Sequence, residues 1–295
     1  MTVRSSLPSP LRRMVRKGYV GLSALSAASR VEPDFLVVGG QRCGTTSLFR
    51  AFEQHPDIVR PTLNKGINYF DINYHRGPRW YRAHFPLART VARDRPAGTA
   101  VATFEASGYY MFHPLAPERI ARDFPAIKVV VMLRDPVERA YSAWKHETAR
   151  GFDNWSFERA IAEEADRTRG ERDRMISDPR YQSSAFRHHS YTARGDYVSQ
   201  LQEFYRRIPA SNIHVIYSES FFSQPEAEFD RLTDFLGVSR ASGLQFDRHN
   251  ARPSGPMPGT TREALSLAYR NQVEELRVLV GLRPPWSSGS TDSDR

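Results

Sequence analysis

The chain has 295 residues, of which 40% are hydrophobic and 12% aromatic, so it can form one large globular domain or two small ones and is not intrinsically disordered. Its formal net charge is +9, but residues 1–30 carry six of these charges and leave three for residues 31–295, which argues against a nucleic-acid-binding surface. A single cysteine, Cys43, excludes internal disulfides and cysteine-based zinc clusters, and indicates a reducing, cytoplasmic environment.

We expect residues 1–32 to form a basic leader ahead of the folded domain. Its apolar residues recur at helical spacing, at Leu11, Met14, Val15, Leu22 and Leu25. The leader is therefore either a disordered segment or a surface helix, at residues 1–30, that contacts an anionic membrane peripherally. A secretory signal is disfavoured because the apolar stretch is short and is interrupted by serine and glycine.

Continuous apolar runs predict buried strands, each followed by a loop. We expect strands at 35–38, 101–104, 128–133 and 213–217, and helices at 45–54 and 137–150. This alternation predicts right-handed crossovers and a single-domain α/β fold, with a central parallel sheet flanked by helices and a P-loop-like strand–loop–helix. Ligands bind beyond the carboxyl ends of such strands, so the loops after them should form the site.

Two segments fall outside this alternation. Residues 153–190 are rich in arginine and acidic residues, and form either a solvated helical excursion or a lid over a substrate. Residues 284–295 are rich in serine, glycine and aspartate, and we expect a disordered tail there. The folded domain is therefore expected to span residues 33–283.

The loop after the first strand is the most informative segment. Gly39-x-x-x-x-Gly44 has the spacing of an ATP-binding P-loop, but Thr45 and Thr46 follow where that motif has lysine and a hydroxyl residue. The cation is instead Arg42, inside the loop. A glycine-rich turn that opens a helix gathers backbone N–H groups around a phosphate, and this version suits a 5′-phosphosulfate better than a magnesium-bound triphosphate. The candidate phosphate-binding residues are Gln41, Arg42, Cys43, Gly44, Thr45, Thr46 and Ser47.

A second candidate phosphate site follows the strand at 128–133. Arg134 leaves this strand within Arg-Asp-Pro, and Ser142 follows eight residues later on the next helix. A guanidinium and a hydroxyl that face one site suit a phosphate monoester. Taken alone, each segment also has a purely structural explanation: a junction that needs glycine, and an ion-paired helix cap.

Together the two segments resemble those of the sulfotransferases that use 3′-phosphoadenylyl sulfate (PAPS), above all the heparan-sulfate type and its bacterial relatives. In that family the first segment holds the 5′-phosphosulfate and the second holds the 3′-phosphate. The resemblance covers roughly residues 33–283 and includes 65–71, 105–110 and 195–201. It implies PAPS as co-substrate without a metal, and it adds Gly195 and Tyr197 as donor-binding residues.

The sequence departs from the family pattern at residues 65–70. The family's Lys-Glu-x-His-Phe-Phe appears here as Lys-Gly-Ile-Asn-Tyr-Phe, so Gly66 replaces an acidic residue that is a proposed catalytic base in some members, and Asn68 replaces the histidine. Where the family often has lysine in the first loop, this chain has Arg42. The cations are retained. A catalytic base, however, must be supplied by another residue or be unnecessary for the reaction.

The resemblance implies in-line sulfuryl transfer, in which positioning and charge stabilisation dominate. Arg42 and Lys65 would stabilise the leaving phosphate and the sulfonate oxygens. Glu105, after a short strand, is the first candidate to orient or deprotonate the acceptor hydroxyl, and His113 is the second.

The acceptor is less well defined by the sequence. Six aromatic residues either wall a cleft for a sugar or lipid or belong to the core: Tyr69, Phe70, Trp80, Tyr81, Tyr109 and Tyr110. We expect a hydroxyl of a carbohydrate, glycolipid or other small acceptor. The alternatives are a protein that binds PAPS or its product adenosine 3′,5′-bisphosphate (PAP) without catalysis, and a P-loop nucleotide kinase, which would need a loop lysine and a magnesium-binding acid.

Overall fold

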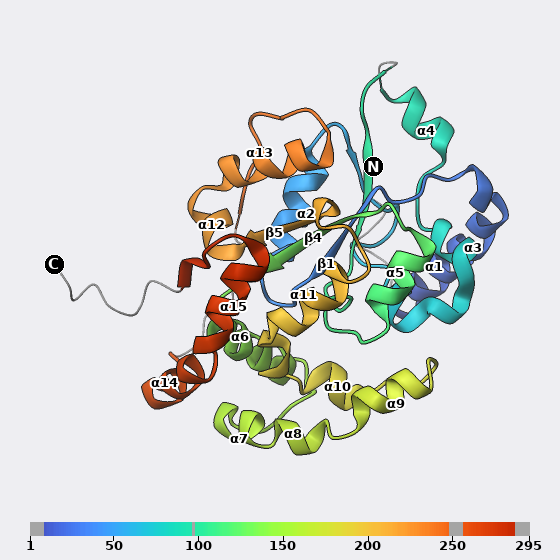
Figure 1. The fold of residues 1–295 in the computed structure, drawn as a ribbon. Coiled ribbons are helices and arrows are strands. Elements are labelled where there is room, and N and C mark those ends of the chain that lie inside the picture. Colours follow the sequence, from blue (N-terminus) through green and yellow to red (C-terminus); the bar gives the residue numbers. More distant parts are fainter. Residues whose placement is uncertain (1–8, 96–97, 248–255, 287–295) are drawn as a thin grey trace.

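The computed structural model describes residues 9–95, 98–247 and 256–286, and contains a five-stranded parallel sheet in the order β2-β3-β1-β4-β5 (Figure 1). The strands are β1 (Phe35–Gly39), β2 (Ile58–Val59), β3 (Ala102–Ala106), β4 (Lys128–Leu133) and β5 (Ile213–Tyr217). The expected α/β fold with a central parallel sheet is confirmed. Strand β2, which the sequence analysis did not identify, is only two residues long and pairs with β3 at one edge.

Helices cover both faces of the sheet, which explains why its strands are apolar on both sides. One face packs against α2 (Thr45–Gln54), α12 (Ser218–Ser223) and α13 (Pro225–Leu236). The other packs against α3 (Gly77–Arg82), α5 (Ala116–Asp123), α11 (Tyr197–Tyr205) and α15 (Arg270–Val280) (Figure 1). Alternate residues of β1 and β4 enter the two cores: Leu36 and Val129 enter one, Phe35 and Val130 the other.

The charged segment 153–190 folds into short helices beneath α6 (Pro136–Ala149) in the view of Figure 1. They are α7 (Phe157–Ala162), α8 (Glu164–Arg167), α9 (Glu171–Ser177) and α10 (Ser184–His188). Buried carboxylates tie the segment to the body, because Glu164 accepts hydrogen bonds from the backbone N–H groups of Thr192 and Ala193 at 2.6 and 2.8 Å. The segment is therefore a packed helical layer, in which Glu164 and Asp153 are buried and most of the other charged side chains are exposed.

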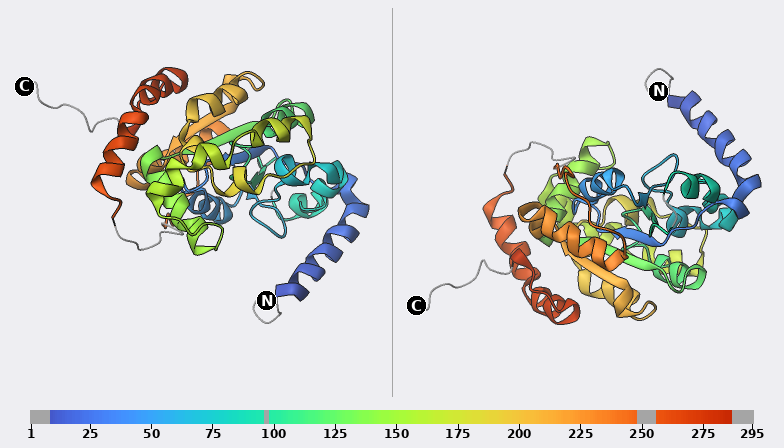
Figure 2. Two further views of the ribbon diagram at one scale, coloured as in Figure 1. Left: turned by 90° about the horizontal axis from the view of Figure 1, so that it is seen from below. Right: turned by 90° about the horizontal axis from the view of Figure 1, so that it is seen from above.

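Helix α1 (Ser9–Ser23) and a 3₁₀ turn (Ala24–Ser29) lie at the edge of the molecule, and Figure 2 shows α1 projecting away from the sheet. Residues 1–8 of the leader and 287–295 of the tail lie outside the described residues. The remaining elements are a π-helical turn (Tyr69–Asn73), 3₁₀ turns (Tyr74–Arg76, Ala193–Gly195 and Ala210–Asn212), α4 (Ala88–Arg93) and α14 (Gly259–Ala268). Among the described residues, no helix combines the length and apolar character needed to cross a membrane.

Candidate active site

The loop between β1 and α2 is held against the end of β4. The N–H of Gly40 donates to the carbonyl of Met132 at 2.6 Å, and Gly44 begins α2 with a φ of 91°. A Cβ at Gly44 would lie 3.0 Å from Met132 Cε and 3.1 Å from the Phe222 ring, so both the backbone conformation and the space favour glycine. The expected P-loop-like strand–loop–helix is confirmed, with the first backbone N–H groups of α2 at the loop.

Lys65 points into this loop from the segment that follows β2. Its ammonium donates to the hydroxyls of Thr45 and Thr46 at 3.2 and 3.0 Å, and no carboxylate of the described chain lies within ion-pair distance of it. Burial, and then the charge of Arg50, lower the pKa of Lys65 to about 7. A partly buried ammonium that contacts two hydroxyls and lies 5.8 Å from the centre of the Phe49 ring fits an anionic ligand, because such a ligand would supply a counter-charge.

The two sequence segments that carried the resemblance meet in space. Arg42, with a φ of 70°, donates from Nε to the hydroxyl of Ser142 at 3.0 Å. Arg134 lies beside them, with Nη1 3.5 Å from the carbonyl of Arg42 and Nη2 3.7 Å from Glu138. Asp135 caps α6 by accepting from the N–H of Val137 at 2.9 Å, which begins the helix that carries Ser142. Two guanidinium groups and a hydroxyl thus converge beside the loop.

A third guanidinium group approaches the loop from the turn before α11. Arg194 is buried and donates to the side-chain carbonyl of Gln41, and burial lowers its pKa to about 10. The amide nitrogen of Gln41 donates to Glu147 on α6 at 3.3 Å. Neither Arg194 nor Glu147 is predictable from the sequence: Arg194 directly precedes the predicted residue Gly195, but one arginine among so many carries no signal of its own.

Three other predicted donor-binding residues are buried in packing. Cys43 is fully buried, and burial raises the pKa of its thiol to about 11, which agrees with a space-filling role. The hydroxyl of Tyr197 donates to the carbonyl of Arg134 at 2.8 Å, and a Cβ at Gly195 would lie 2.6 Å from the Tyr269 hydroxyl. Tyr197 therefore holds the backbone just after β4, and Gly195 allows the close approach of Tyr269.

The first candidate base, Glu105, does not reach the surface of the site. Its carboxyl is fully buried, accepts from the N–H of Ile67 at 2.9 Å and from the hydroxyl of Ser107, and burial raises its pKa to about 7. Ser107 in turn accepts from the N–H of Asn68 at 3.0 Å. Glu105 thus holds the backbone that follows Lys65, through its hydrogen bond from the N–H of Ile67.

The second candidate, His113, is also buried. Burial lowers its pKa to about 3, so it is neutral, and its Nδ1 accepts from the N–H of Leu115 at 3.2 Å. At Gly66, a Cβ would lie 2.8 Å from the carbonyl of Ala106, so this tight contact leaves no room for the acidic residue of the family pattern.

The aromatic cleft weighed from the sequence is mostly core. Tyr69, Phe70, Tyr81 and Tyr110 are at most 1% exposed and pack in one cluster beside the sheet. These four rings are therefore largely core, and Tyr69 and Tyr81 also line a cavity beside Tyr74 and Phe124. In the part of the chain that the structure describes, no group of three or more histidine, cysteine or acidic residues is placed to hold a metal ion.

The class of protein follows from this fold and from the sequence match. The chain matches the sulfotransferase-domain family over residues 32–250, and therefore belongs to the sulfotransferase family. The resemblance drawn from the two phosphate-binding segments is thereby confirmed.

Individual relatives agree with this assignment. The chain is 27% identical over 281 residues to human bifunctional heparan sulfate N-deacetylase/N-sulfotransferase 3, a match that covers 84% of this chain and 30% of the human protein. It is 24% identical over 321 residues to membrane-associated sulfotransferase kil1 of Dictyostelium discoideum, covering 87% of this chain and 67% of that protein. The chain thus spans less than a third of the length of the human relative.

Among solved structures, a sulfotransferase from Alicyclobacillus acidocaldarius is similar to most of the chain. It has a TM-score of 0.64 and 28% sequence identity, over 85% of this chain and 97% of that chain. This similarity supports the sulfotransferase fold of the chain.

Proposed function

We propose that this protein transfers the sulfuryl group of PAPS to a hydroxyl group of an acceptor. The observation that carries the proposal is the convergence of Arg42, Lys65 and Arg134 at one edge of the sheet, with a P-loop-like turn that lacks the lysine of a nucleotide kinase. Three cations gathered at one edge of the sheet fit a ligand that carries several negative charges, and the ion pair of Arg134 with Glu138 is long, at 3.7 Å.

The positions of these residues suggest that they bind different groups of PAPS. Lys65 and the backbone N–H groups at the start of α2 would hold the 5′-phosphosulfate, while Arg134 and Ser142 would hold the 3′-phosphate. Arg42, which contacts Ser142, would stabilise charge that develops on the leaving phosphate. PAPS supplies the activated sulfuryl group, and the protein supplies position and counter-charge.

For the acceptor we favour a carbohydrate or glycolipid hydroxyl. This rests on relatives whose names specify heparan sulfate, since the aromatic side chains weighed from the sequence are largely core. Incubation with [³⁵S]PAPS and an acceptor panel tests it: desulfated heparan sulfate, a neutral glycolipid and a simple phenol. We expect label in the polysaccharide or the glycolipid. Label in the phenol alone would contradict the acceptor class, and PAP binding without any transfer would favour the non-catalytic alternative.

We further propose that α1 attaches the protein peripherally to an anionic membrane. The exposed side chains of Met14, Val15 and Leu22 share one face of the helix, whereas Val20 on the opposite side packs against the body. Residues 1–30 carry six basic and no acidic residues, which complements anionic lipid. The relative named as membrane-associated also supports this proposal.

Vesicle flotation tests the attachment. We expect the full chain to float with vesicles of phosphatidylcholine and phosphatidylserine, and to float much less with pure phosphatidylcholine. Leu22→Glu should abolish flotation, whereas Leu267→Glu, at a similarly exposed position on α14, should not. Equal flotation of the two variants, or self-association without vesicle binding, would refute a membrane-binding face.

A further inference from the structure

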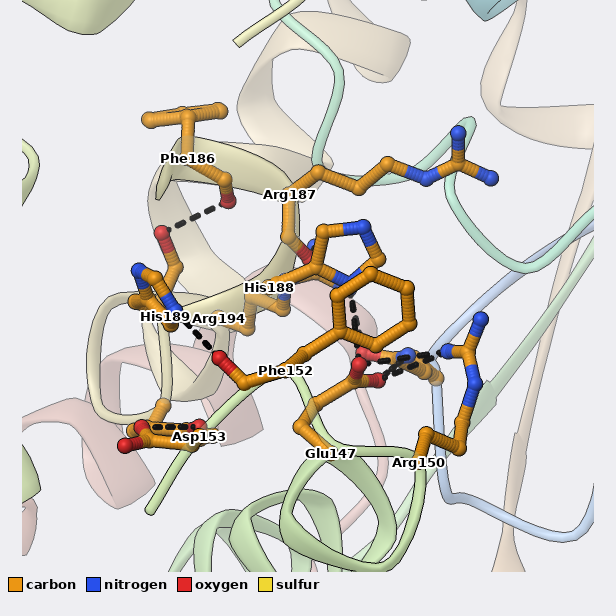
Figure 3. Close-up of polar contacts among 12 residues, drawn as sticks. Glu147, Arg150, Phe152, Asp153, Phe186, Arg187, His188, His189 and Arg194 are labelled. Atoms are coloured by element: carbon orange, nitrogen blue, oxygen red, sulfur yellow. Dashed lines mark hydrogen bonds and ion pairs between the residues drawn. The ribbon is translucent and has the colours of Figure 1, made fainter. Parts of the chain in front are cut away.

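Two ionisable side chains from distant segments meet directly beside the loop. Glu147 near the end of α6 and His188 at the end of α10 lie 2.8 Å apart, from carboxylate Oε2 to imidazole Nδ1 (Figure 3). The other carboxylate oxygen, Oε1, accepts from the amide of Gln41 at 3.3 Å. Gln41 belongs to the loop and precedes Arg42, so Glu147 is one hydrogen bond away from the loop and His188 is two.

The imidazole is fixed in orientation as well as in position. Its ring stacks on Phe152, with 3.8 Å between the centroids and 5° between the planes (Figure 3). Because a carboxylate only accepts hydrogen bonds, Nδ1 carries the proton that Glu147 receives, and Nε2 of neutral His188 is left with a lone pair. Within the described ranges no hydrogen-bond partner of Nε2 is found, and the side chain remains 11% exposed.

Assuming the proposed function, we propose that His188 accepts the proton of the acceptor hydroxyl and that Glu147 positions it. The hydroxyl oxygen forms a new bond to sulfur, and its proton passes to Nε2 of His188. The bond between sulfur and the bridging oxygen breaks, and its electron pair leaves with the 5′-phosphate of PAP. Acid–histidine pairs prepare an imidazole for this task by fixing its tautomer and stabilising its protonated form.

The remainder of the site favours this assignment. Position 66 is a glycine with no room for a carboxylate, and both Glu105 and His113 are buried in other contacts. His188, in contrast, is carried by the helical layer at 153–190, which lies next to the loop through Gln41. That layer would therefore contribute the imidazole of His188, which would contact the acceptor hydroxyl.

The charges around the pair are mixed. The carboxylate of Glu147 contacts the guanidinium of Arg150 at 3.2 Å as well as His188, and Gln41 links it to Arg194. His188, Arg150 and His146 lower the pKa of Glu147 despite its burial, so the carboxylate is ionised at neutral pH. A charged acceptor of hydrogen bonds is what the positioning role requires.

Rates of transfer from [³⁵S]PAPS to desulfated heparan sulfate test the assignment. We expect His188→Asn to lower kcat about 100-fold or more while the dissociation constant of PAP changes less than about twofold. The fall of kcat at acidic pH, where the imidazole becomes protonated, should be absent in His188→Asn. His189→Asn is the matched control, because His189 bonds the carbonyl of Phe152 and not Glu147. An equal loss in this control, or an unchanged rate in His188→Asn, would overturn the proposal.

A measurement without an acceptor separates this inference from the proposed function. In ¹⁵N spectra of the full chain, adding PAP should shift the imidazole resonances of His188 but not those of exposed His75. Glu147→Gln should shift the acid limb of kcat to lower pH, since the imidazolium loses its anionic partner, with PAP affinity maintained. PAP binding without a response from His188 would refute its role while leaving the proposed function intact.

Discussion

Arg42 and Ser142 are 100 residues apart in the sequence and joined by a 3.0 Å hydrogen bond from guanidinium to hydroxyl. The contact links the turn after β1 to the helix after β4. These are neighbouring parallel strands, so their carboxyl ends lie together, and the two segments proposed to bind phosphate meet at one edge of the sheet.

Arg42 is expected to act in the chemical step. Its loss removes a cation from the position where the leaving phosphate gains charge, so Arg42→Ala should lower kcat about 100-fold or more. Arg42→Lys should retain a larger part of the activity, because a cation remains. Arg231→Ala, on the exposed surface of α13, provides the control in the same radiolabel assay. Turnover of Arg42→Ala close to that of the control would remove Arg42 from the mechanism.

Arg134 is expected to act in donor binding. Arg134→Ala should raise the dissociation constant of PAP roughly 10- to 100-fold, on the scale of charge-assisted hydrogen bonds, and leave kcat at saturating PAPS nearly unchanged. Calorimetric titration with PAP measures the first effect and initial rates measure the second. A large fall in kcat with unaltered PAP affinity would contradict the assignment.

Lys65 couples donor binding to protonation. Its pKa is lowered from 10.5 to about 7 in the free protein, so the unfolded chain binds this proton over a pH range in which the folded protein releases it. Stability should therefore rise with pH across this range. An anionic ligand restores the charged form, so PAP binding at pH 8 should take up roughly one proton.

Calorimetry in two buffers with different ionisation enthalpies measures this proton uptake. Lys65→Arg is the matched control, because a guanidinium remains charged and should show none. The same proton count for the wild type and this variant would show that the donor phosphates do not contact Lys65.

A variant of Glu105 tests whether this residue has a structural role or acts as the catalytic base. Its pKa is raised from 4.5 to about 7 by burial, so the folded protein holds a proton that the unfolded chain releases. Its contribution to stability is complete below pH 4.5 and is lost as pH rises through about 7. The melting temperature should therefore fall less between pH 4.5 and about 7 in Glu105→Gln than in the wild type. The variant should retain transfer within a few-fold; a 100-fold loss with intact PAP binding would restore Glu105 as the base.

The sequence predicted the fold well where a pattern is local. The apolar runs of β1, β4 and β5 are continuous because the parallel sheet is covered on both faces. Strand β2 is too short to give a periodic signal. The segment at 153–190 looked like solvated surface, because nothing in the sequence distinguishes buried Glu164 and Asp153 from the exposed acids beside them.

The proximity of the two segments proposed to bind the donor was predictable for the same reason. Its residues lie in two short segments with characteristic spacing, each at a strand end. Glu147 and His188 are 41 residues apart, and their contact depends on how α10 packs beneath α6. Glu105 was assigned to the correct edge, but strand alternation turns its side chain into the core.

The central claim is that this site binds a 3′-phosphorylated adenine nucleotide. Calorimetric titration of the full chain with PAP, and in parallel with ATP–Mg²⁺, tests it most directly. We predict binding of PAP, no detectable binding of ATP–Mg²⁺, and stabilisation by about 2.7 kcal/mol at 100 times the dissociation constant of PAP. Binding of ATP–Mg²⁺ without binding of PAP would contradict the account and favour a nucleotide kinase.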